Sequence, residues 1–239
     1  DNTIQAFRIA EELRTPVMVN YEGYIQSHTQ EGVEAPSAEK VAAFLPLKRM
    51  PVMDINNPQG VNTVTSPDFY MDYKFRQNEA LEKALTVIPQ VSEDYKKEFG
   101  RDSRGLLEAY RMEDVEHAIV AMGSIVSTAR LLVDNLRSQG KKIGLVKLRV
   151  WRPFPGKELY ENLKNVKYVT VLDKNIVFGV GGALATDIKA AFYGRTEMVI
   201  NSCIIGLGGA KSGVAEIKQA VDSTEDCSES KNSSVWIGL

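Results

Sequence analysis

The segment His117-Ala118-Ile119-Val120-Ala121-Met122-Gly123-Ser124 decides the fold class of this chain. Its apolar run predicts a buried strand, and Gly123-Ser124 then turn the chain into Ile125–Ser138, where apolar residues recur at helical spacing. Gly140 follows as the residue that ends this helix. A buried strand joined to a helix by a short turn is the repeating unit of parallel α/β sheets.

The same alternation of strand and helix continues over residues 105–239. Further strands are predicted at Leu106–Tyr110, Ile143–Val150, Val166–Leu172 and Met198–Ile205, with an edge strand at Val235-Trp236-Ile237. Helices are predicted at Pro155–Leu163, Ala183–Tyr193 and Val214–Val221, with glycine turns at Gly179–Gly182 and Gly206–Gly209. The predicted fold class is therefore α/β, a mainly parallel sheet with helices on both faces.

The N-terminal part of the chain has a weaker pattern. It is predicted to contain a helix at Ile4–Leu13 capped by Asn2 or Thr3, a short buried strand at Pro16–Asn20, a polar loop at Tyr21–Glu34, and a helix at Ala38–Phe44 capped by Ser37. Five of the nine prolines then lie between Pro36 and Pro67. Such an irregular stretch, residues 45–68, is typical of a segment that wraps a partner.

Three regions are predicted along the chain. Residues 1–68 form the first region, 69–104 a helical connector and 105–239 an α/β domain, with the boundary at Gly100–Gly105. Pro89 interrupts the helical pattern of Tyr70–Phe99, which predicts a kinked helix or two helices. An amphipathic helix at the start of a chain without an initiator Met also indicates missing upstream sequence.

Composition and charge exclude several classes of protein. The chain has 239 residues, of which 44% are hydrophobic and 25% charged, values of an ordinary globular protein and not of a disordered one. Its apolar runs are too short to cross a bilayer, and no signal segment opens the chain. A net charge of −2 disfavours nucleic acid and an anionic membrane as partners.

The small number of cysteines and histidines limits metal and redox chemistry. Cys203, Cys227, His28 and His117 show no CxxC or HxxxH spacing, whereas an iron–sulfur cluster usually needs four thiolates. No metal site is therefore predicted, and without a disulfide pattern a reducing, cytoplasmic setting is expected. His117 lies in an apolar strand and is interpreted as structural, whereas His28 lies in a polar loop and is a candidate for a functional contact.

Three turns at the carboxyl ends of predicted strands are candidates for ligand binding. Gly123-Ser124 either offers helix amides and a hydroxyl to an anion or simply caps the helix. Phe178-Gly179-Val180-Gly181-Gly182 lacks the third glycine of a dinucleotide fingerprint, so close helix–sheet packing is favoured. Asp173-Lys174-Asn175 is expected at the ligand-facing edge of the sheet, with an internal salt bridge or a subunit contact as the alternative.

Ordered stretches along the chain resemble the α subunit of 2-oxoacid:ferredoxin oxidoreductases, the pyruvate synthase family. They are Pro16–Thr29, Asp54–Pro58, Asp114–Ser124, Lys147–Pro155, Val171–Gly179 and Ile205–Gly209. Two departures from the family pattern are Glu22 before Gly23 and Ala210-Lys211 after the double glycine. The resemblance implies a domain like the C-terminal domain of transketolase over 105–239, preceded by the tail of a thiamine pyrimidine-binding domain over 1–68.

The resemblance also implies an activity, cofactors and partners. The activity is thiamine diphosphate-dependent oxidative decarboxylation of a 2-oxoacid, with pyruvate favoured, in which coenzyme A takes the acyl group and ferredoxin the electrons. Thiamine diphosphate with Mg²⁺ and [4Fe–4S] clusters would belong to the whole complex, and this chain alone is expected to hold none of them. The implied partners are a thiamine diphosphate-binding β subunit, a γ subunit and a ferredoxin-like δ subunit. 2-Oxoglutarate, branched 2-oxoacids and oxalate stay open as substrates.

Catalytic residues are expected upstream of Asp1, so the chain is not expected to turn over substrate by itself. The residues that the chain offers are candidates for the ligand edge, where coenzyme A could bind, or for a subunit interface. They are Ser27, His28, Thr29, Asp173, Lys174, Asn175, Gly179, Gly181 and Gly182. Two other functions remain open: a non-catalytic interaction or scaffolding module of the same fold, and a free-standing nucleotide-binding enzyme.

Overall fold

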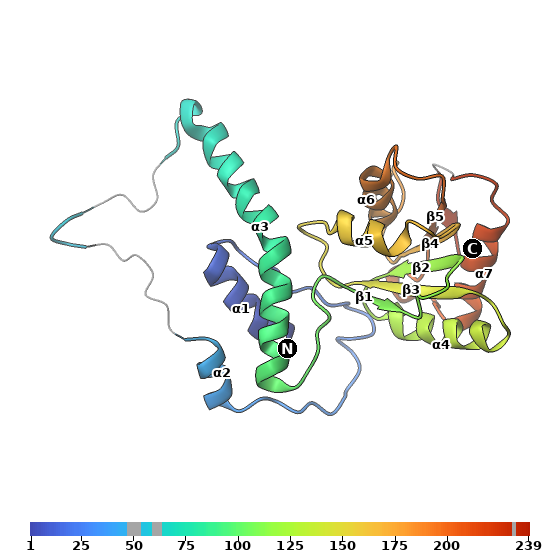
Figure 1. Ribbon diagram of the computed structural model, residues 1–239, viewed down its shortest axis with the longest axis horizontal. Helices are drawn as coiled ribbons and strands as arrows, with labels where there is room; N and C mark the ends of the chain where they lie inside the picture. Colours follow the sequence, from blue (N-terminus) through green and yellow to red (C-terminus); the bar gives the residue numbers. More distant parts are fainter. Residues whose placement is uncertain (47–53, 59–63, 231–232) are drawn as a thin grey trace. The chain divides into compact units, whose positions relative to one another are not determined.

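The computed structural model describes residues 1–46, 54–58, 64–230 and 233–239. Of the irregular stretch 45–68, residues 47–53 and 59–63 lie outside the described residues. The chain forms two compact units, the first made of Asp1–Asn20 and Gly32–Gly105 and the second of Tyr21–Glu31 and Leu106–Leu239 (Figure 1). The short segment Tyr21–Glu31 is therefore part of the second unit, although its neighbours in sequence belong to the first.

The second unit is built on one six-stranded sheet. Its strands are β1 (Leu107–Tyr110), β2 (His117–Ala121), β3 (Ile143–Leu148), β4 (Tyr168–Asp173), β5 (Val199–Ile204) and β6 (Val235–Trp236). Their order across the sheet is β1-β3-β2-β4-β5-β6, with β1 antiparallel to β3 and all other neighbours parallel. The predicted α/β fold class is confirmed, including the edge strand near the C-terminus.

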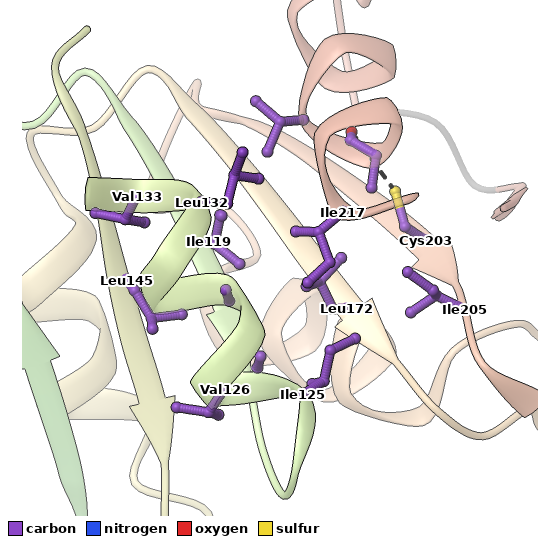
Figure 2. Close-up of a cluster of buried hydrophobic side chains, with 14 of the residues drawn as sticks. Ile119, Ile125, Val126, Leu132, Val133, Leu145, Leu172, Cys203, Ile205 and Ile217 are labelled. Atoms are coloured by element: carbon purple, nitrogen blue, oxygen red, sulfur yellow. Dashed lines mark hydrogen bonds between the residues drawn. The ribbon is translucent and has the colours of Figure 1, made fainter. Parts of the chain in front are cut away.

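Helices cover both faces of this sheet (Figure 1). They are α4 (Ile125–Ser138), α5 (Gly156–Leu163), α6 (Ala183–Phe192) and α7 (Val214–Glu225), with the 3₁₀ turn η1 (Leu207–Gly209) before α7. Apolar side chains of α4 and α7 pack on one face, and those of α5 and α6 pack on the other. Figure 2 shows the first of these clusters, in which Ile217 and Leu132 lie near Ile119 and Leu172 of the strands.

The register of the parallel strands brings their carboxyl ends to one edge. Val120 of β2 pairs with Val171 of β4, and Asp173 of β4 pairs with Ile204 of β5. The turns that follow these strands therefore lie side by side, which is where open α/β sheets bind ligands. This edge is called the carboxyl edge below.

The first unit is helical in its described residues. It contains α1 (Asn2–Leu13), α2 (Ala38–Phe44) and α3 (Pro67–Phe99). The ring of Phe44 packs edge-on against Tyr95 at 5.4 Å between centroids, and Tyr95 stacks on Phe99 at 4.3 Å. Ser37 caps α2 as predicted, because its hydroxyl accepts a hydrogen bond from the Lys40 amide at 3.4 Å.

Two predictions for the first unit are wrong, and one of two alternatives fails. Asn2 and Thr3 lie inside α1, and the residue at its N-cap is Asp1. Pro16–Asn20 is not a strand, because no described residue pairs with it and Met18 is 81% exposed. The alternative of two helices at Pro89 also fails, since α3 continues through this proline as one helix.

Among the described residues, no helix combines the length and the apolar character needed to cross a bilayer.

Candidate functional site

A charged trio lies at the carboxyl edge of the second unit. Lys174, the residue after β4, donates a hydrogen bond from its ammonium group to the carboxylate of Glu22, and the hydroxyl of Ser124 donates to the other carboxylate oxygen. The ammonium nitrogen of Lys174 also lies 3.4 Å from the Ser124 hydroxyl oxygen. The trio joins the turn after β2, the turn after β4 and the segment Tyr21–Glu31.

The trio is largely withdrawn from solvent. The side chains of Lys174 and Glu22 are 15% and 17% exposed. This burial acts to raise the pKa of the Glu22 carboxyl, but the hydrogen bonds from Lys174 and Ser124 and the attraction of the ammonium charge outweigh it, so the pKa is lowered. Glu22 is therefore a carboxylate at neutral pH. The alternative that the sequence analysis left open, an internal salt bridge, is present at Lys174.

Ser124 does not cap α4 with its side chain. Its backbone has helical angles, and its hydroxyl makes no cap hydrogen bond. Ser124 therefore stands at the N-cap position, as one of the two sequence interpretations has it, but its hydroxyl donates to Glu22 and does not cap the helix. A side chain that caps a helix usually comes from a residue with extended backbone angles, and the helical angles of Ser124 do not provide this geometry.

Asp173 and Asn175 hold the start of α6. The Asp173 carboxylate, 1% exposed, accepts hydrogen bonds from the amides of Leu184 at 2.9 Å and Ala185 at 3.0 Å. Asn175 accepts from the Ala183 amide at 3.2 Å and donates to Asp173 at 3.3 Å. Burial raises the pKa of Asp173, although the amide bonds act in the opposite direction. The first-turn amides of α6 are thus paired with groups of the chain itself.

The glycines before α6 allow this close approach. A Cβ atom at Gly182 would lie 2.1 Å from a carboxylate oxygen of Asp173, and one at Gly181, where φ is +124°, would lie 2.6 Å from the Ser234 hydroxyl. Gly179, with φ at +80°, turns a short loop that a bridge between Val177 and Gly181 closes. Close packing, the favoured sequence interpretation, accounts for Gly181 and Gly182.

Ser27, His28 and Thr29 form an exposed turn in the segment Tyr21–Glu31. The Ser27 hydroxyl donates to the carbonyl of Gly23 and lies 3.0 Å from Nδ1 of His28. The Thr29 hydroxyl donates to the carbonyl of Ile25 at 3.0 Å. These hydrogen bonds are local, whereas the contacts of the segment with the carboxyl edge are made by other residues, among them Glu22.

The other histidine and the two cysteines are not members of the charged trio. His117, at the amino end of β2, is 4% exposed, and its ring nitrogens lie 2.7 Å from the Thr170 hydroxyl and 3.2 Å from a Glu225 carboxylate oxygen. The prediction of a structural histidine is confirmed. Cys203 and Cys227 are buried free thiols, and burial raises the pKa of Cys203 to about 12. Within the part of the chain that the structure describes, no three His, Cys, Asp or Glu residues group as metal ligands.

The sequence does not identify Glu22 as a site residue, because it stands out there only as a departure from a family pattern. Ser124 is a candidate in the sequence, either as a hydroxyl that meets an anion or as a cap. The pairing itself has no local signal, because Glu22 and Lys174 are 152 positions apart. A glutamate in a polar loop and a lysine after a buried strand are each ordinary on their own.

Comparison with known proteins gives matches along most of the chain. Residues 1–93 match the family model "Pyruvate flavodoxin/ferredoxin oxidoreductase, thiamine diP-bdg", and residues 115–217 match "Pyruvate:ferredoxin oxidoreductase core domain II". The pyruvate synthase subunit PorA of Methanothermobacter thermautotrophicus is 41% identical over 242 residues, which cover 100% of this chain and 61% of that protein. The chain belongs to the 2-oxoacid:ferredoxin oxidoreductase family. It aligns with the subunits named PorA and VorA.

Relatives within this family differ in the substrate that they are named for. The PorA subunit of Thermotoga maritima is 39% identical over 93% of this chain, and the ketoisovalerate oxidoreductase subunit VorA of Pyrococcus abyssi is 34% identical over 96% of it. The chain spans 58% and 59% of the lengths of these two relatives.

Two solved structures are also similar. A 2-oxoglutarate:ferredoxin oxidoreductase from Magnetococcus marinus gives a TM-score of 0.39 at 15% identity, covering 65% of this chain and 24% of that one. A split gene transketolase gives 0.38 at 16% identity, covering 47% of this chain and 40% of that one.

Proposed function

We propose that this chain is part of the α subunit of a thiamine diphosphate-dependent pyruvate:ferredoxin oxidoreductase. The enzyme converts pyruvate and coenzyme A to acetyl-CoA and CO₂ and passes two electrons to ferredoxin. The observation that carries this proposal is the 41% identity to a pyruvate synthase subunit along the whole chain. The α/β fold of the second unit, with its turns at the carboxyl edge, supports the same proposal.

In this proposal the cofactors are held by other parts of the complex. Two cysteines are too few for a [4Fe–4S] cluster, and the raised pKa of Cys203 opposes the thiolate that a cluster needs. The described residues also lack a three-ligand group that fits the Mg²⁺ of thiamine diphosphate. The β, γ and ferredoxin-like δ subunits are the proposed partners that supply these groups.

The proposed contribution of this chain is a surface at the carboxyl edge. Ser27, His28 and Thr29 are exposed on one turn of the segment that Glu22 joins to this edge, and Phe178 in the loop around Gly179 is 88% exposed. We propose that these residues face coenzyme A or a neighbouring subunit. In this proposal, buried contacts fix the turns that form this edge. These contacts are made by Asp173, Lys174, Asn175, Gly181 and Gly182.

A second substrate is favoured by a specific similarity. The VorA relative, at 34% identity, is named for ketoisovalerate, a branched 2-oxoacid. The higher identity to PorA makes pyruvate the first choice and ketoisovalerate the second.

The test is turnover by the complete complex, purified without oxygen and supplied with coenzyme A and ferredoxin. We expect reduction of ferredoxin with pyruvate, at a kcat/KM at least ~10-fold above that with ketoisovalerate, because one additional branched group typically separates substrates by about that factor or more. A preference for ketoisovalerate would replace the first substrate with the second. A complex that assembles but reduces ferredoxin with no 2-oxoacid would favour the non-catalytic module.

A further inference from the structure

The segment Tyr21–Glu31 is attached to a unit from which it is distant in sequence. It belongs to the compact unit formed by Leu106–Leu239, while the residues on both sides of it, up to Asn20 and from Gly32, belong to the other unit. Two sets of contacts among the described residues attach it. One is the charged trio of Glu22, Lys174 and Ser124, and the other is the packing of Tyr24 against Gly209.

The charged trio is the stronger attachment. At 17% and 15% exposure, Glu22 and Lys174 differ from a surface pair such as Asp222 and Lys218, whose side chains are 52% and 51% exposed. An exposed ion pair contributes little to stability, whereas removing one partner of a desolvated and hydrogen-bonded pair leaves the other charge without compensation. The Glu22 carboxylate also accepts a hydrogen bond from the hydroxyl of Ser124.

Glycines on the second unit provide the space for both attachments. A Cβ atom at Gly206, where φ is +66°, would lie 3.2 Å from Cε of Lys174. A Cβ atom at Gly209, where φ is +82°, would lie 3.0 Å from the ring of Tyr24. The glycines of the turn after β5 therefore leave room for the side chains of Lys174 and Tyr24 to lie against its backbone.

The rest of the segment is a compact turn with its own hydrogen bonds. The amides of His28 and Thr29 donate to the carbonyl of Ile25 at 3.1 Å and 3.0 Å, and the Ser27 hydroxyl donates to the carbonyl of Gly23. A turn of this length is not stable by itself, because fixing its backbone costs more conformational entropy than its few hydrogen bonds offset, so these hydrogen bonds depend on the attachment of the segment to the second unit.

We propose that Glu22 is a positioning residue, whose ion pair with Lys174 and Ser124 holds the turn Ser27-His28-Thr29 at the carboxyl edge of the sheet. The proposal rests on the proposed function in one respect, that this edge faces coenzyme A or a partner subunit. The attachment itself stands on the contacts above. Glu22 does not touch the reacting atoms in this proposal, and it acts through the turn that it holds.

The test is hydrogen–deuterium exchange of the assembled complex, read from peptides that cover Tyr21–Glu31. Glu22→Gln and Lys174→Met each remove one charge of the trio, and we expect exchange at the His28 and Thr29 amides to become at least ~10-fold faster, since a charge-assisted hydrogen bond contributes about that factor. Glu22→Asp keeps the carboxylate and should retain most of the protection. Lys218→Met removes the exposed ion pair of α7 and should leave Tyr21–Glu31 unchanged.

A charge reversal separates positioning from general damage. The double variant Glu22→Lys with Lys174→Glu restores opposite charges and should protect the segment better than either single reversal. Equal exchange in wild type, Glu22→Gln and Lys174→Met would overturn the proposal, as would a double reversal no better than the singles. If the charge variants fail to assemble, Ser124→Ala removes one hydrogen bond and should still speed exchange; an unchanged rate would overturn the proposal.

The exchange measurement does not depend on turnover. A wild-type complex that oxidises no 2-oxoacid would end the proposed function, and the exchange rates would still decide whether Glu22 holds the turn.

Discussion

A single buried carboxylate organises the start of α6. Asp173 accepts hydrogen bonds from two first-turn amides, and at the N-terminus of a helix the backbone dipole favours its negative charge. The sequence indicates that Asp173 lies at the carboxyl edge, and the structure agrees. What the residue does there depends on α6 turning back over it, which no local pattern of Asp173-Lys174-Asn175 reveals.

Gly182 is the position where this arrangement is most sensitive. We expect Gly182→Ala to destabilise the subunit by about 1–3 kcal/mol, because a Cβ atom 2.1 Å from the Asp173 carboxylate forces that cap to move. Urea unfolding of the purified subunit measures the change. The matched control is Gly23→Ala, since a Cβ there has no neighbour within 4 Å. Equal stability of the two variants would show that Asp173 is not held tightly against Gly182.

Residue-level predictions succeed where a residue's own strand defines its surroundings. His117 lies in a run of apolar residues, so a buried, hydrogen-bonded imidazole could be predicted, and the structure confirms it. Glu22 and Ser124 could not be recognised as partners, because their contact joins positions that are 102 apart. Only the folded chain brings such groups together.

At the scale of elements, the pattern of strands and helices after Leu106 predicts the fold well. The strands β2, β4 and β5 are buried over nearly all of their length, so their runs are strong and the glycine turns mark their ends. Pro16–Asn20 has a similar apolar run but lacks a described pairing strand, and sequence alone does not show whether a partner exists. The helix α3 passes through Pro89 because residues with a helical pattern flank it on both sides.

The packing of α4 on the sheet allows a direct test of this element. Leu132 is 2% exposed and faces the sheet, whereas its neighbour Leu131 is 60% exposed. We expect Leu132→Ala to cost about 2–5 kcal/mol of unfolding free energy, because it leaves a cavity between helix and sheet. Leu131→Ala should change the unfolding free energy by less than about 0.5 kcal/mol. Similar losses in both variants, measured by urea unfolding, would contradict the observed orientation of α4.

At the scale of the whole molecule, the chain consists of two compact units. Its second unit is a complete sheet with two apolar clusters, and the described residues of its first unit are helical. Family membership could be predicted because motifs that resemble the family occur in order along the chain. Relatives that are 41% and 34% identical to the chain support this assignment. Substrate choice was not predictable in the same way, because PorA and VorA subunits are both similar over nearly all of this chain.

Anaerobic native mass spectrometry of the complex containing this chain, purified from its source with cofactors retained, tests the proposed enzyme most directly. The predicted result is one assembly that contains partner subunits, thiamine diphosphate and iron–sulfur clusters. A chain that remains alone or self-associated, without either cofactor in any assembly, would contradict the proposal that it works as an α subunit of a 2-oxoacid:ferredoxin oxidoreductase.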